Sequence, residues 1–230
     1  MTSAPPVLPP SNVPAINPTP SGSLNRDAHP HGWLDAAWVI GGSLVLGGLT
    51  SFAQGVLPDG LRSFANSPSG WTLLTVIMIS LRRPRLLPAA WLGAVSFVCL
   101  VLGYTLVSEL RGLTYSPLSW GAVGLVAGPV IGCSTAAAFD SRPFLRVLGS
   151  SLLAGVAITD AVYGLTVVAD TTSPVYWLIA GAAGVVFLGL VAVCGRLRWR
   201  YVAAQVGLTL MWVAIGSAGY AALGWLLAGG

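Results

Sequence analysis

One acidic residue, Asp160, lies inside the otherwise apolar run AITDAVYGLTVV. An ionised carboxylate that faces hydrocarbon costs roughly 3 kcal/mol, so we expect this side chain to face the protein interior. Loss of water disfavours the charged form of a carboxyl group. We therefore expect Asp160 to be at least partly protonated near neutral pH, and a protonated acid in a dry pocket can donate its proton. The alternative is a neutral carboxyl group that only joins helices by hydrogen bonds.

Further polar and aromatic residues follow at helical spacing. Tyr163 lies three residues after Asp160, on the same helix face, and can orient it. A second stripe, with members three or four residues apart, lies in the last apolar segment: Gln205, Thr209, Trp212, Gly216 and Tyr220. Such a stripe points inward. It predicts either the wall of a substrate cavity or a line of interhelical contacts.

The third apolar segment adds weaker candidates. Tyr104 and Ser108 share one of its faces and join the stripe as candidate substrate-binding residues. Glu109 ends that segment, and Asp35 begins the first one. Both carboxyl groups are candidate proton acceptors, and both positions also suit solvated charges at the membrane interface.

Several chemistries are excluded because the residues they need are missing. The chain has no lysine, so a Schiff base cannot form. The only histidines, His29 and His31, precede the first apolar segment, and the three cysteines are isolated from one another. This pattern offers no metal-ligand set, no Ser/His pair and no redox CxxC. We expect no cofactor and no metal, which leaves acid–base work in an apolar, aromatic cavity.

The composition shows what positions these residues. The chain has 230 residues, of which 55% are hydrophobic and 8% charged, whereas soluble domains carry roughly 25% charged residues. Residues 1–30 are rich in proline and predict a disordered tail, followed by a transmembrane domain over 31–230. A membrane-spanning helix needs about 20 apolar residues. The candidate segments are 33–53, 66–81, 86–108, 118–138, 147–168, 175–195 and 202–228.

These segments predict an all-α polytopic transmembrane bundle of seven helices. The segment 66–81 is the weakest, and its alternatives are a short, tilted or re-entrant helix and a full span that begins near Ser63. Arginines cluster in the loops before the third, fifth and seventh segments, and this pattern marks the cytoplasmic side. The N-terminus is then cytoplasmic and the C-terminus external, in the plasma membrane of a bacterium. The net charge of +4 comes from these loops and does not indicate nucleic-acid binding.

Three glycines form a doubled small-xxx-small pattern at Gly124, Gly128 and Gly132. This pattern allows the backbones of two helices to approach closely. It predicts helix packing within the chain or a dimer interface, and the oligomeric state stays open.

Across about 44–177 the chain resembles an uncharacterised bacterial family of small multi-pass membrane proteins. The resemblance is carried by AQGVLPDGLRSFANSPSGW, the RRPR turn, GYTLVSELRG, GLVAGPVIG and YGLTVVADTTSPVYW. It implies a topology and no activity. In size and architecture alone, the chain is also loosely similar to membrane-bound terpene cyclases, which implies metal-free protonation of a linear prenyl chain.

Two functions follow as expectations. In a terpene cyclase, Asp160 acts as the general acid, Tyr163 orients it, and Glu109 or Asp35 accepts the final proton. The rings that would face the carbocations are Trp212, Tyr104 and Tyr220. The alternative is a binding or transport protein similar to the substrate-capturing subunit of vitamin importers, with the loops 54–69, 109–117 and 169–174 as its lid and rim. In either case the partners are the lipid bilayer and a small apolar molecule.

Overall fold

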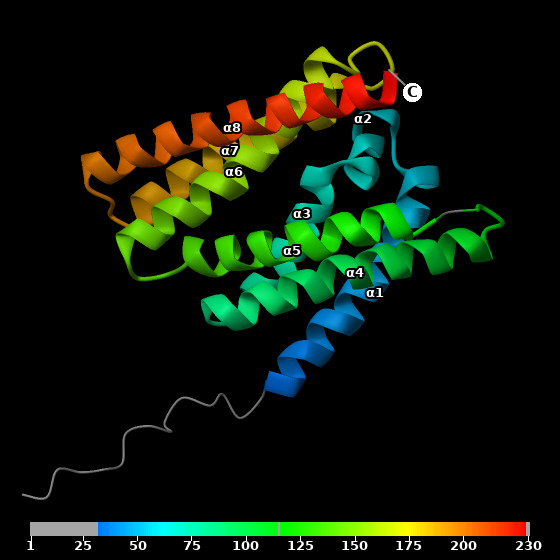
Figure 1. The fold of residues 1–230 in the computed structure, drawn as a ribbon, viewed down its shortest axis with the longest axis horizontal. Coiled ribbons are helices and arrows are strands. Elements are labelled where there is room, and N and C mark those ends of the chain that lie inside the picture. The colour runs from blue at the N-terminus through cyan, green and yellow to red at the C-terminus, as the bar shows by residue number, and fades with distance from the viewer. Residues whose placement is uncertain (1–31, 115, 229–230) are drawn as a thin grey trace, which may run out of the picture. The chain divides into compact units, whose positions relative to one another are not determined.

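The computed structural model describes residues 32–114 and 116–228, and it is all-helical over these ranges. The elements follow the order α1 (Gly32–Val56), α2 (Asp59–Arg62), the 3-10 helix η1 (Ser63–Asn66), α3 (Pro68–Ser80), α4 (Leu86–Leu110), α5 (Leu118–Ala138), α6 (Pro143–Thr166), α7 (Pro174–Cys194) and α8 (Trp199–Ala228) (Figure 1). The all-α prediction is confirmed. The proline-rich tail expected over 1–30 lies outside the described residues.

Six helices in the described part of the chain are long and apolar enough to cross a membrane: α1, α4, α5, α6, α7 and α8. The protein is therefore membrane-embedded. The prediction of seven spanning helices needs correction, because α3 has only 13 residues. At 1.5 Å per residue it is roughly 20 Å long, less than the ~30 Å thickness of the hydrocarbon layer.

The second segment is broken at a Ser-Pro pair. Ser67 has an extended backbone, with φ −105° and ψ 145°, and its Oγ accepts a hydrogen bond from the backbone N–H of Gly70. Pro68 occupies the first turn of α3, where its missing N–H costs nothing. Proline does not continue a preceding helix, so the chain before it folds separately as α2 and η1. The expected segment 66–81 thus contains one short helix, α3, which is separated from the helical turns before it.

Small residues bring α4 into contact with both α1 and α5. A Cβ placed on Gly132 would lie 2.0 Å from the carbonyl oxygen of Ala89, and one on Gly47 would lie 2.0 Å from that of Leu100. The predicted glycine pattern therefore serves packing within the chain. We call α1, α4 and α5 the glycine-packed region.

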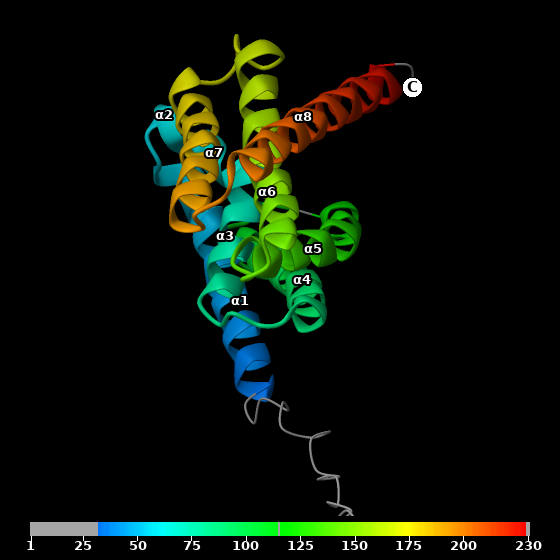
Figure 2. The ribbon, with the colours of Figure 1, turned by 90° about the vertical axis from the view of Figure 1, so that its left-hand side faces the viewer.

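The remaining helices surround α6. Helix α6 packs against α7 and α8, and also against α5, while α3 contacts α4, α5 and α6 (Figure 1). Figure 2 shows that α8 crosses α6 obliquely. The two ends of α3 therefore contact different helices. Its N-terminal end contacts α6 and α7, and Arg82, just after its C-terminal end, pairs with Asp35 of α1.

Most arginines gather at one end of this bundle, which we call the arginine end: Arg82, Arg83, Arg85, Arg142, Arg146, Arg196, Arg198 and Arg200. Arg82 pairs with Asp35 at the start of α1, with 2.5 Å between Nη2 and Oδ1. Asp140 accepts hydrogen bonds from Arg142, which hold the pKa of this carboxyl group below its usual value. The exposed ion pairs of this end are typical of an interface with water.

Candidate ligand site

Asp160 is buried, with 1% of its surface exposed, and accepts three hydrogen bonds. Its Oδ2 accepts from the backbone N–H of Ser69 at 2.9 Å and, in a very short contact, from the Ser69 hydroxyl. Its Oδ1 accepts from the Tyr220 hydroxyl at 2.8 Å. Ser69 lies in the first turn of α3, so the carboxyl group also meets the positive end of a helix dipole.

A second layer of hydroxyl groups supports this contact. The Tyr176 Oη lies 2.7 Å from the Ser69 Oγ and 2.6 Å from the Ser67 Oγ. With the Gly70 N–H donating to Ser67, the donors can all be oriented toward Asp160, because each hydroxyl both donates and accepts. The network joins the start of α3 to α6, α7 and α8.

The sequence placed Asp160 near the middle of a span over 147–168. Helix α6 instead begins at Pro143 and ends at Thr166. Asp160 is therefore roughly 9 Å from the end of the helix, on the side away from the arginine end.

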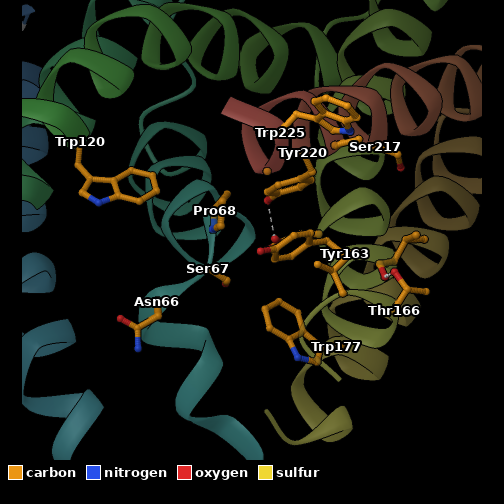
Figure 3. Close-up of a pocket in the computed structure, with 15 residues that line it drawn as sticks. Asn66, Ser67, Pro68, Trp120, Tyr163, Thr166, Trp177, Ser217, Tyr220 and Trp225 are labelled. Atoms are coloured by element: carbon orange, nitrogen blue, oxygen red, sulfur yellow. Dashed lines mark hydrogen bonds between the residues drawn. The ribbon is translucent and has the colours of Figure 1, made fainter. Parts of the chain in front are cut away.

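An aromatic cavity of about 810 Å³ opens beside the carboxyl group. Five rings line it: Trp120, Tyr163, Trp177, Tyr220 and Trp225. Figure 3 shows Tyr220, Tyr163 and Trp177 along one side, facing Ser67 and Pro68 at the start of α3. Asp160 is the only acidic residue among the described residues that line this cavity, and none of these residues is basic.

A polar vestibule of about 640 Å³ shares Asn66, Tyr163 and Trp177 with the aromatic cavity. Its other walls come from α2, η1 and the loop between α6 and α7, including Asp59 and Asp170. Both segments belong to the end of the bundle away from the arginines. The vestibule and the aromatic cavity are therefore neighbours that share part of their walls.

The two predicted tyrosines lie together at the acid. Tyr220, expected as a substrate-binding residue of the stripe in the last helix, makes the hydrogen bond to Asp160, whereas the sequence suggested Tyr163 as the residue that orients it. Tyr163 instead stacks on the Tyr220 ring, with the ring centroids 4.2 Å apart. Tyr163 therefore fixes the ring whose hydroxyl contacts the acid.

The other stripe residues lie outside the aromatic cavity. Gln205 is buried and donates from Nε2 to the Ser150 Oγ at 2.9 Å. Thr209 donates to the Gln205 carbonyl within α8. Trp212 lies over Gly155 and lines an apolar groove between α5, α6 and α8. The stripe is thus mainly a packing surface, from which Tyr220 reaches the site.

Four candidates lie apart from Asp160. Tyr104 donates to the Gln54 Oε1 at 3.0 Å and lines a neighbouring cavity of about 300 Å³, which shares Ser67, Pro68 and Trp120 with the aromatic cavity but does not include Asp160. Ser108 pairs with Ser51 at 2.9 Å between their hydroxyl oxygens. Glu109 is exposed at the end of α4, and Asp35 lies in its ion pair at the arginine end. The structure does not bring Glu109 or Asp35 to the cavity of Asp160.

Sequence reasoning missed Ser67, Ser69 and Tyr176. The signal for the first two was the helix-start pattern of Ser67 and Pro68, which predicts an α-helix N-terminus within an apolar segment. A second Ser-Pro pair, Ser173 and Pro174, starts α7 just before Tyr176. The three missed residues therefore lie at two helix N-termini that the sequence marks.

Together the fold and the site define a membrane-embedded helical protein with an aromatic cavity beside a buried acid. Residues 26–225 match the family of unknown function DUF6518, and the chain belongs to this family. The match extends the expected resemblance over 44–177 to include α8 and Tyr220. No curated protein and no solved structure matches the chain significantly. These comparisons show no likeness to terpene cyclases.

Proposed function

We propose that this protein binds a small, largely apolar molecule in the aromatic cavity and takes it from the vestibule side of the membrane. The observation that carries the proposal is the aromatic cavity itself, whose walls include Asp160 and three residues that also line the vestibule. Its volume of about 810 Å³ lies within the range of roughly 300–1,000 Å³ that is typical of ligand sites. This is the binding function expected for a substrate-capturing membrane subunit.

The broken second segment supports the same function. Irregular backbone at membrane depth is tolerated where it is buried in protein or lines a cavity. In transporters, half-helix ends at such breaks build the substrate site. Ser67 and Pro68, at the break before α3, line the aromatic cavity.

The direction of access follows from the arginines. We propose that the arginine end faces the cytoplasm of a bacterium, because basic loops are retained on that side of the plasma membrane. Although α3 is short, it leads the chain back to the arginine end, because Arg82 just after it pairs with Asp35 at the start of α1. The N-terminus is then cytoplasmic, and both the vestibule and the C-terminus are external. The ligand would enter from outside, between the α2–η1 segment and the loop after α6.

Filling the cavity tests the proposal. Ala221 lines the cavity, whereas its neighbour Ala222 does not. We expect native mass spectrometry of the protein, purified from its own membranes, to detect a small molecule bound one-to-one. Ala221→Trp should lose this molecule and Ala222→Trp should keep it. Equal occupancy of the wild type and Ala221→Trp, or no bound molecule in any of the three proteins, would contradict the proposal.

The acid-initiated terpene cyclase is our second proposal. Five rings beside a carboxyl group favour it, since π faces stabilise carbocations. A general acid, however, must direct a proton at the substrate, whereas both oxygens of Asp160 accept hydrogen bonds from the protein. The geometry therefore favours binding over proton donation.

Product analysis separates the two functions. Purified protein would be incubated with fifteen- and twenty-carbon prenyl substrates and the extracts analysed for cyclic products. We expect none. Cyclic products that form with the wild type and disappear with Asp160→Asn would establish the cyclase instead.

A further inference from the structure

Asp160 has hydrogen-bond donors but no counter-charge. Its three donors are the neutral groups of Ser69 and Tyr220. Within the described residues no basic side chain pairs with it: Arg62 pairs with Asp59 at 2.8 Å, and Arg111 bonds to Ser51 on α1. An ionised carboxylate only accepts hydrogen bonds, and three donors match that form. In its ionised form this carboxyl group has no counter-charge among the described residues.

The surrounding rings suit a cation. Aromatic faces attract ammonium groups, most strongly in the case of tryptophan, and cages of such rings recognise quaternary amines. Trp120, Trp177 and Trp225 line the cavity with Tyr163 and Tyr220. The Tyr220 ring connects the two features, because its hydroxyl bonds to Asp160 while its ring stacks on Tyr163.

The charges at the entrance point the same way. The vestibule is lined by Asp59, Arg62 and Asp170, and Arg62 is neutralised by its pair with Asp59. Asp170 is left as the excess charge, while the arginine end lies at the other end of the bundle. A negative entrance raises the local concentration of cations.

Other ligand classes fit less well. An anion cannot use the N-terminus of α3, because Asp160 already accepts from the Ser69 N–H and Ser67 from the Gly70 N–H. A hard metal ion needs six or so oxygen ligands, usually with several carboxylates, and the described residues contain no cluster of three or more His, Cys, Asp or Glu side chains. A neutral molecule would leave the carboxylate without a counter-charge.

We propose that the ligand is an organic cation: a quaternary or protonated amine on an apolar body, held by the charge of Asp160 and by the aromatic rings. This inference rests on the binding function proposed above. The amine occupies the space near Asp160 and Tyr220, and the apolar body lies among the tryptophans.

A pair of isosteric probes tests the charge. Benzyltrimethylammonium and neopentylbenzene have the same shape but differ in charge, and phenylbutyrate supplies an anion. We would titrate each into the full-length protein in lipid nanodiscs and follow tryptophan fluorescence. We expect the cation to bind about 10- to 100-fold more tightly than its neutral isostere, and the anion not to bind. Asp160→Asn should remove most of this preference.

Two controls keep the inference separate from the binding function. Ala221→Trp should abolish binding of both isosteres, and Asp170→Asn should weaken cation binding only at low salt. If the neutral isostere binds as tightly as the cation, or if the anion binds better, the cavity is a ligand site but the charge inference is wrong. If neither isostere binds to the wild type, both proposals fall.

If Asp160→Asn does not fold, Trp177→Leu serves instead. This variant must reduce binding of the cation more than binding of the neutral isostere.

Discussion

The glycine-packed region and the ligand site are built from the same apolar composition but pack in opposite ways. In the first, glycines let the backbones of α1, α4 and α5 approach closely, as at Gly47 and Gly132. In the second, aromatic side chains of α5, α6, α7 and α8 enclose a cavity of about 810 Å³. With so few charges available, side-chain volume at the helix crossings decides whether a region is solid or hollow.

The polar groups differ in the same way. The glycine-packed region pairs identical small hydroxyls, Ser43 with Ser96 and Ser51 with Ser108, each at 2.9 Å. The ligand site concentrates its hydrogen bonds on one carboxyl group, Asp160. Polar groups thus join helices in one region and surround a carboxyl group beside a cavity in the other.

The largest effect is expected where a Cβ cannot fit. Gly132→Ala places a Cβ 2.0 Å from the Ala89 carbonyl oxygen, so α4 and α5 must separate. We expect the free energy of unfolding in mixed micelles, followed by circular dichroism, to fall by about 3 kcal/mol. The matched control is Gly121→Ala on the same helix, where no atom lies within 4 Å. Equal losses in the two variants would contradict the close packing.

A smaller effect is expected in the ligand site. Tyr220→Phe removes one hydrogen bond to Asp160 but keeps the ring that stacks on Tyr163. We expect the free energy of unfolding to fall by about 2 kcal/mol, the size of a hydrogen bond to a charged group. Tyr163→Phe is the control, since within the described residues its hydroxyl makes no hydrogen bond. A larger loss in Tyr163→Phe would restore the role that the sequence suggested for that residue.

The smallest effect is expected for the serine pairs. Ser43→Ala removes the hydrogen bond to Ser96, which keeps a contact with Thr75 at 3.2 Å. Interhelical hydrogen bonds in membranes average about 0.6 kcal/mol. We expect a coupling energy of this size from a double-mutant cycle of Ser43→Ala and Ser96→Ala. A coupling above about 2 kcal/mol would mean that these hydroxyls, rather than the glycines, hold α1 to α4.

The spanning helices could be predicted because hydropathy depends on local composition. The segment expected at 118–138 agrees with α5, and the one at 175–195 differs from α7 by one residue at each end. The second segment was harder, since an average over 66–81 does not reveal a break. Its Ser67 and Pro68 mark where α3 begins, and this local signal outweighs the apolar run around it.

The site could be predicted only in part. Asp160 stands out because a carboxyl group among apolar residues needs a partner. The partner itself is not local: Ser69 is 91 residues away in the sequence, and Tyr220 is 60 residues away. Helical spacing favoured Tyr163 as the neighbour of Asp160, but residues on one helix face lie side by side, whereas hydrogen bonds here form across helices.

Helix α3 also works as a short rod. Its first turn is bonded to Asp160 of α6 through Ser69, and just beyond its last turn Arg82 is tied to Asp35 of α1. Thirteen residues without an internal proline make a stiff link. The rod thus ties the candidate ligand site at one end of the bundle to the arginine end at the other.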